Sequence, residues 1–330
     1  MKRVVRRTLW RGAARGLLII ALSGCAAEMA LAQGLYPSRA VHMIVPQPAG
    51  GAVDTVSRLL ALKLSELWRQ SVLVENRPGG GTVISTQAIA RAAPDGYTFG
   101  MVLPAFVINP TLRGDLPYDT LKDFAPLTLL GSSTLALLAH PSLGVNSVKE
   151  LIDLAKSQQV ALEFASLGVG NTTHLAGELF NSMTGLHLLH VPYSGSPPAY
   201  QDMLAGRVKL GYVTLQSSMP HVKAGRLKLL AILNAQRSRE YPELPTVAET
   251  VKGFRVESFM GFIAPVAISR DTAARLCGDL VRVLRAEETR GKLVEFGIEP
   301  MATSAEEFDA FIREEIVKWA PIVRAAGLKP

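Results

Sequence analysis

Short apolar runs alternate with amphipathic segments along most of the chain, and this alternation constrains the fold more than any other feature. Residues 41–45, 71–75 and 97–103 are β-like runs, whereas residues 54–67 and 83–92 carry apolar residues at helical spacing. Parallel neighbouring strands need a crossover helix between them. This order therefore predicts a parallel sheet with right-handed connections in the first part of the chain.

The second half repeats the pattern, and 330 residues are too many for one ordinary core. We therefore expect two α/β lobes. Further strands are predicted at residues 162–166, 186–191, 208–214 and 227–233, and helices at residues 147–157, 172–184 and 196–206. Two more helical patterns begin at Ser269 and Ser304 and close the chain.

Most of the net charge of +7 comes from residues 1–32, which hold six of the 35 basic residues and one of the 28 acidic residues. The rest of the chain is close to neutral and has no basic stripe of the kind that binds phosphate backbones. Aromatic residues are only 6% of the chain, which argues against a base-stacking surface. We expect no nucleic-acid partner.

Residues 1–32 have the pattern of a secretory signal peptide, with a basic stretch followed by the apolar residues 16–22. This apolar stretch is shorter than the roughly 20 residues that cross a bilayer. Two cleavage sites compete. Residues 22–25 resemble a lipoprotein box in which Cys25 would be lipidated, whereas residues 30–32 form an A-x-A site for ordinary signal peptidase. Both predict a periplasmic protein, either membrane-anchored or soluble.

A glycine-rich turn at residues 46–54 joins the first predicted strand to the first predicted helix. Such a turn presents free backbone N–H groups at the positive end of a helix, which favours anion binding. Gly50 and Gly51 lie in this turn, and Asp54 can cap the helix. The alternative is a tight turn with a capping aspartate and no ligand.

The same layout recurs at residues 166–173, where Gly168 and Gly170 follow a strand and precede a helix. Thr173 stands where the third glycine of a dinucleotide fingerprint belongs, and no Gly-Lys-Ser/Thr of a phosphate-binding loop follows. Two anion-binding turns, one in each half, predict a cleft that holds one ligand from both sides. A third turn at residues 79–82 either contributes to this site or is purely structural.

Catalytic and metal-binding patterns are poor. His187 and His190 are three residues apart in a strand pattern, so their side chains point to opposite faces. His174, near a helix start, is expected to form a local hydrogen bond, and Cys277 is expected to be a packed core residue. No nucleophile has a neighbouring base. We expect no enzyme activity, no cofactor and no metal.

Several short motifs together resemble the Bug receptors, the solute-binding subunits of tripartite tricarboxylate transporters. The resemblance covers residues 36–328. Its marks are residues 44–46 (IVP) with Gly50, Gly51 and Asp54, 74–79 (VENRPG), 93–97 (APDGY), Asn109-Pro110, 116–119 (LPYD), 122–126 (KDFAP), 174–180 (HLAGELF), 190–193 (HVPY), 244–249 (LPTVAE) and Lys318-Trp319.

This resemblance implies an α/β, two-lobed periplasmic-binding-protein fold of the type II kind, with two mixed sheets flanked by helices and joined by two crossing strands. The crossings are expected near residues 129–138 and 254–263. One lobe would comprise residues 33–131 plus 257–330, and the other residues 132–256.

The resemblance also implies a small carboxylate ligand, held largely by backbone N–H groups and bridging waters. The ligand-binding residues it implies are Gln47, Ala49, Gly50, Gly51 and Asp54 on one side, and Ser166, Gly168, Gly170, Asn171, Thr172, Thr173 and Thr214 on the other.

Two departures from the family pattern bear on the ligand. Thr214 stands where an aspartate is common, so this position offers no charge to a ligand amine. Residues 104–107 (PAFV) replace a loop that is commonly rich in Ser and Thr. Both departures predict a carboxylate with an apolar or aromatic body rather than an amino acid.

The expected function is that of a monomeric periplasmic receptor, which captures a small carboxylate between its lobes and delivers it to a membrane permease. An exported sensor that feeds a signalling partner would have the same pocket, so the sequence leaves this alternative open. An exported hydrolase is a third hypothesis, and it would need a nucleophile beside a histidine.

Overall fold

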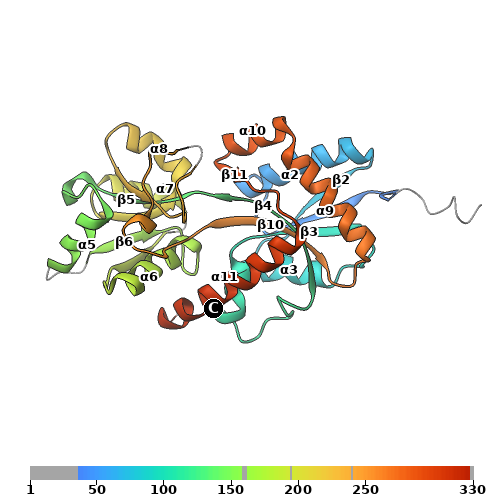
Figure 1. Ribbon diagram of the computed structural model, residues 1–330, viewed down its shortest axis with the longest axis horizontal. Coiled ribbons are helices and arrows are strands. Elements are labelled where there is room, and N and C mark those ends of the chain that lie inside the picture. Colours follow the sequence, from blue (N-terminus) through green and yellow to red (C-terminus); the bar gives the residue numbers. More distant parts are fainter. Residues whose placement is uncertain (1–35, 158–161, 194, 239–240, 328–330) are drawn as a thin grey trace, which may run out of the picture.

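The protein consists of two α/β lobes joined by strands that cross between them (Figure 1). The computed structural model describes residues 36–157, 162–193, 195–238 and 241–327. The predicted signal peptide, Cys25 and both cleavage sites lie outside the described residues. Within the described residues, none of the helices combines the length and apolarity that a bilayer crossing requires.

The first lobe contains a six-stranded mixed sheet. β1 pairs in parallel with β2 and β3, as the strand–helix–strand order predicts, whereas β10 runs antiparallel to β3 and β4. The strand order across the sheet is β11 (Ile298–Pro300), β4 (Phe124–Ser133), β10 (Ser258–Pro265), β3 (Thr98–Val102), β1 (Val41–Val45) and β2 (Val72–Asn76).

Helices cover both faces of this sheet, so its strands are buried on both sides. Along β1, Val41, Met43 and Val45 belong to the core beneath α2, whereas Ile44 belongs to the core on the other face. The helices of this lobe are α2 (Ala52–Trp68), α3 (Val83–Ala90), α4 (Ala105–Leu112), α9 (Arg270–Arg285), α10 (Glu287–Glu295) and α11 (Ala305–Ala325), with the 3₁₀ turn η1 (Gly80–Thr82).

The second lobe contains a five-stranded sheet, in which β6 pairs in parallel with β7 and β8, and β5 runs antiparallel to β8 and β9. The order is β7 (Leu189–Pro192), β6 (Glu163–Ser166), β8 (Leu210–Thr214), β5 (Leu135–Ala139) and β9 (Lys228–Ile232). Its helices are α5 (Val148–Ser157), α6 (Thr172–Thr184), α7 (Ser196–Leu204) and α8 (Leu215–Lys223), with the 3₁₀ turns η2 (Pro141–Leu143) and η3 (Val247–Glu249).

Two connections cross between the lobes at the predicted places. β4 continues through Thr134 into β5, and the chain returns through residues 254–257 into β10. The two crossings lie side by side, because Ser258 pairs with Ser133. The return segment is also tied to the second lobe by a 2.9 Å hydrogen bond from the N–H of Val256 to the carbonyl of Leu233. We refer to these two connections as the hinge between the lobes.

Residues 104–107 differ from the expectation of a loop, because they begin helix α4. Pro104 occupies the N-cap position, where a missing backbone N–H costs no helical hydrogen bond. Phe106 and Val107 are fully buried in the core, so only part of this segment can face a ligand.

Candidate ligand-binding cleft

A cleft of about 980 Å³ lies between the two lobes and is lined by residues of both. Five helices begin at this cleft, each contributing its N-cap residue and at least one neighbouring residue to the lining. The N-cap residues are Gly51 of α2, Thr82 of α3 and Pro104 of α4 from the first lobe, and Asn171 of α6 and Gly195 of α7 from the second.

The polarity of the cleft comes from these helix ends and not from charged side chains. None of the described residues that line it is an Asp, Glu, Lys, Arg or His. Each helix N-terminus carries unpaired N–H groups and a partial positive charge. Five such ends beside a lining without charged side chains favour the binding of an anion over that of a cation.

The turn before α2 is held in shape by Asp54. Gly50 has a φ of +84°, and its N–H donates to Asp54 Oδ2 over 2.9 Å. The Asp54 side chain is only 4% exposed and also accepts from Arg58 Nε and Asn76 Nδ2, each at 2.9 Å. The hydrogen bond from Arg58, followed by that from Gly50, lowers the pKa of Asp54 to about 2. Asp54 therefore lies behind the turn as an ionised support and does not line the cleft.

The turn before α6 has a similar internal support. The N–H of Leu167 donates to Thr173 Oγ1 over 2.9 Å, and the N–H of Thr173 donates to Asn171 Oδ1 over 3.1 Å, which is a side-chain N-cap. The N–H of Gly170 donates to His174 Nδ1 over 3.1 Å. The local hydrogen bond predicted for His174 is therefore confirmed.

A second histidine, His190, lies beneath the same turn. Its Nε2 is 2.6 Å from Ser166 Oγ, and its ring stacks on His174 with 3.6 Å between centroids. Burial, followed by the neighbouring His174, lowers the pKa of His190 to about 4. The two stacked rings support the turn from behind. Among the described residues, no group of three or more His, Cys, Asp or Glu side chains is placed to hold a metal ion.

Cys277 is only half-buried and is therefore not the core residue that was predicted. Its thiol donates to the carbonyl of Leu127 over 2.9 Å, and burial raises its pKa. A raised pKa disfavours the reactive thiolate.

The structure brings most of the residues predicted for the site to the cleft. The lining contains Gln47, Ala49, Gly50, Gly51, Gly168, Gly170, Asn171 and Thr172. Asp54, Ser166, Thr173 and Thr214 are outside the lining. The first three support the turns from behind. Thr214 is the N-cap of α8 and does not line the cleft, so the identity of its side chain does not select the ligand.

Sequence reasoning missed part of the lining. Gly195 and Ser196 at the start of α7 line the cleft, and the Ser-Pro helix start was the signal that could have identified them. Ser258 and Met260 also line it, from β10. Because β10 enters the sheet only by long-range pairing, no local pattern marks these two residues as cleft residues.

One wall of the cleft is apolar. Leu103, Pro104, Ala105 and Ile108 line it at the end of β3 and the start of α4, with Met260 from β10. The predicted apolar wall is therefore present, but Pro104 and Ala105 form it instead of the buried Phe106 and Val107.

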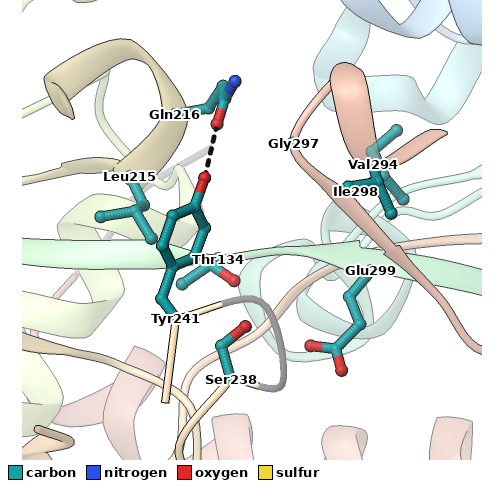
Figure 2. Close-up of a pocket in the computed structure, with 9 residues that line it drawn as sticks. All are labelled: Thr134, Leu215, Gln216, Ser238, Tyr241, Val294, Gly297, Ile298 and Glu299. Carbon is teal, nitrogen blue, oxygen red and sulfur yellow. Dashed lines mark hydrogen bonds between the residues drawn. The ribbon is translucent and has the colours of Figure 1, made fainter. Parts of the chain in front are cut away.

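A much smaller pocket of about 30 Å³ lies at the hinge (Figure 2). The second lobe contributes the start of α8 and residues after β9, and the crossing contributes Thr134. The first lobe contributes Val294, Gly297, Ile298 and Glu299. In the first lobe's sheet, β11 and β3 lie on opposite sides of β4 and β10. The hinge pocket and the large cleft therefore flank the crossing strands on opposite sides.

Two lobes, two crossing strands and a ligand-sized cleft between them define a periplasmic solute-binding protein. Within that class, residues 56–328 match the family model described as "Tripartite tricarboxylate transporter family receptor", and the protein belongs to this family. The resemblance to Bug receptors is thereby confirmed. The chain is a solute-binding receptor and not an enzyme, which removes the hydrolase hypothesis. Its family implies the membrane subunits of a tripartite transporter as partners.

Several relatives match most of the chain. Protein BugT from Bordetella pertussis is 33% identical over 315 residues, which cover 94% of this chain and 96% of BugT. An R. palustris protein solved with adipate is 33% identical and has a TM-score of 0.75, covering 90% of this chain and 100% of that chain. MatC from Rhodopseudomonas palustris, solved with bound malate, is 28% identical with a TM-score of 0.70, covering 87% and 100%.

Proposed function

We propose that the protein captures a small carboxylate in the cleft between its lobes and delivers it to the permease subunits of a tripartite tricarboxylate-type transporter. The observation that carries this proposal is the meeting of five helix N-termini at a cleft whose described lining contains no charged side chain. Backbone N–H groups on both sides can hold carboxylate oxygens without a competing side-chain charge. The proposed binding residues are the predicted ones that line the cleft, namely Gln47, Ala49, Gly50, Gly51, Gly168, Gly170, Asn171 and Thr172. Asp54, Ser166 and Thr173 would support the two turns from behind.

The ligand class follows from the wall of the cleft. Leu103, Pro104, Ala105, Ile108 and Met260 offer apolar contact between the two sets of N–H groups. This arrangement favours an acid with an apolar body. Adipate has such a body and malate carries a hydroxyl group, and the relatives solved with these acids support the assignment to small carboxylates.

Binding is proposed to close the cleft. A volume of about 980 Å³ is larger than a small acid fills, so ligand contacts on both sides require the lobes to approach each other. The lobes would be residues 33–131 plus 257–330 and residues 132–256, turning about the crossing strands. The closed, liganded form is the one that the permease would recognise.

Export is part of the proposal. Residues 1–32 would act as a signal peptide, with cleavage after Ala32 or before a lipidated Cys25. Mass determination of the mature N-terminus from the native host distinguishes the two forms.

The proposal is tested by thermal unfolding of the purified mature protein with adipate, malate, citrate, glutamate and benzoate. An acid at about 100 times its Kd should add about 2.7 kcal/mol to the unfolding free energy. The matched control is adipamide, which keeps the body of adipate and removes its charge. Stabilisation by an acid and none by its amide is expected. No stabilisation by any acid, in protein free of co-purified ligand, would contradict the proposal.

A further inference from the structure

Thr82 stands out among the residues that line the cleft, because its backbone is strained. Its φ is +75° with ψ at −1°, in the left-handed region that β-branched residues rarely occupy. Residues of this kind persist only where their surroundings hold them, and they cluster at functional sites.

The surroundings of Thr82 do hold it in this conformation. Its carbonyl accepts two hydrogen bonds, from Ser85 Oγ at 2.8 Å and from Thr86 Oγ1 at 2.9 Å. Asn109 Nδ2 donates to the preceding carbonyl, that of Gly81, at 2.9 Å. Three side chains thus fix the peptide groups around Thr82 and keep the residue at the start of α3.

The hydroxyl of Thr82 is the second unusual feature. The residue is 8% exposed, and its Oγ1 is buried without a hydrogen-bond partner. A threonine at an N-cap usually accepts a hydrogen bond from the first helical turn, but Thr82 makes no such bond. Because a buried hydroxyl without a partner is costly, its persistence at a ligand cleft calls for a partner that arrives with the ligand.

We propose that Thr82 is a ligand-binding residue, and that its hydroxyl donates a hydrogen bond to a carboxylate oxygen of the bound ligand. Thr82 lines the cleft, so a rotation about χ1 can bring its hydroxyl to a bound ligand. The inference rests on the proposed function and adds to it a side-chain contact from the turn at residues 79–82. This turn then completes the carboxylate site together with the turns before α2 and α6.

The test is calorimetric titration of adipate and malate into the wild type and three variants. Thr82→Val keeps the shape and removes the hydroxyl, and Thr82→Ser restores it. Loss of a hydrogen bond to a charged group should weaken binding by about tenfold to a hundredfold in Thr82→Val, with most of the affinity recovered in Thr82→Ser. Thr289→Val is the matched control, because Thr289 Oγ1 is also buried without a partner but lies on α10, outside the cleft.

Thr82→Val with wild-type affinity would overturn the inference while leaving the proposed function intact. So would a loss in Thr289→Val as large as that in Thr82→Val. A wild-type protein that binds neither these acids nor any other carboxylate would overturn both the inference and the proposed function.

The strain at Thr82 is tested separately, by unfolding without ligand. Thr82→Gly should unfold at higher urea concentration than Thr289→Gly, since both variants lose a buried side chain but only at position 82 does glycine relieve a φ of +75°. Its failure to do so would contradict the strain on which the inference is built.

Discussion

Gly50 and Gly170 show how single residues fix the shape of the turns at the cleft. Both have positive φ angles, +84° and +71°, and both donate their N–H to a buried side chain four residues further on. The acceptors are Asp54 in the first lobe and His174 in the second. The two turns are therefore supported in the same way, with the support placed behind the ligand-facing backbone.

Replacing Asp54 should lower the stability of the protein. Asp54→Ala leaves the N–H of Gly50 and the side chains of Arg58 and Asn76 without their acceptor, so we expect a loss of about 1–3 kcal/mol in unfolding free energy. Asp309→Ala, which removes an exposed ion pair with Arg313, should change stability by less than about 1 kcal/mol. Urea unfolding measures the unfolding free energy of both variants. Equal effects in the two variants would show that Asp54 has no special role.

The lowered pKa of His190 predicts how the stability of the protein depends on pH. Burial and the neighbouring His174 lower its pKa from an ordinary 6.5 to about 4, so the unfolded chain binds the proton more tightly than the folded one. The stability that neutral His190 contributes is present above pH 6.5 and is lost as the pH falls toward 4. Urea unfolding at pH 7, 5.5 and 4.5 should show a smaller pH dependence in His190→Gln than in the wild type. An unchanged dependence would refute the assignment.

At the scale of secondary-structure elements, α11 is tied to the hinge through Glu315. This carboxylate is 1% exposed and accepts hydrogen bonds from Lys318, from Trp319 Nε1 at 2.9 Å, and from Arg255 at 2.8 Å. Arg255 belongs to the chain segment that returns from the second lobe. Burial lowers the pKa of Lys318. One buried acid thus joins the last helix to a crossing connection.

Replacing Glu315 should lower the unfolding free energy strongly. Glu315→Ala leaves two cations and an indole N–H without their acceptor, and we expect a loss of about 3–5 kcal/mol. Its neighbour Glu314 is 67% exposed and 3.9 Å from the same arginine, so Glu314→Ala is a matched control with an expected change of less than about 1 kcal/mol. Chemical unfolding compares the two. A cost for Glu315→Ala near that of Glu314→Ala would show that the contact is not a significant part of the hinge.

The elements with strong local patterns were predictable. The helix at residues 172–184 was predicted at the bounds it has in the structure, because Asn171 caps it and Gly185 ends it. α4 was missed because Pro104 and Pro110 are typical of loops, although Pro104 lies at its N-cap. β11 was missed because its three residues form a strand only by pairing with β4. Thr82 could not be selected, since neither its φ nor its unpartnered hydroxyl has a sequence signature.

At the scale of the whole molecule, the two pockets flank the hinge on opposite sides. In the smaller one, Tyr241 Oη lies 3.4 Å from Gln216 Oε1, and Gly297 approaches Gln216 from the other lobe (Figure 2). If the lobes turn about the crossing strands, closure of the large cleft moves these two surfaces apart. We therefore expect the described arrangement to be the open one, in which the two lobes meet at the smaller pocket.

Gly297→Ala tests this geometry. An added Cβ would lie 2.8 Å from Gln216 Cβ, which is closer than van der Waals contact allows. We expect the lobes to separate on this side and to approach each other across the cleft. We expect a smaller radius of gyration for the ligand-free variant in small-angle X-ray scattering. Gly144→Ala is the control, because Gly144 has a φ of +76° against +75° for Gly297 and no atom within 4 Å of its added Cβ. The same radius in both variants would contradict the hinge assignment.

The central claim is that a carboxylate is held by helix N-termini from both lobes at once. It is tested most directly by backbone amide chemical shifts of the ¹⁵N-labelled mature protein during a titration with adipate. We predict large shifts for the amides of residues 51–53 and of Thr172 at the same adipate concentration, and none at either site with adipamide. Binding of adipate that shifts the amides of only one lobe, or of neither turn, would contradict the account.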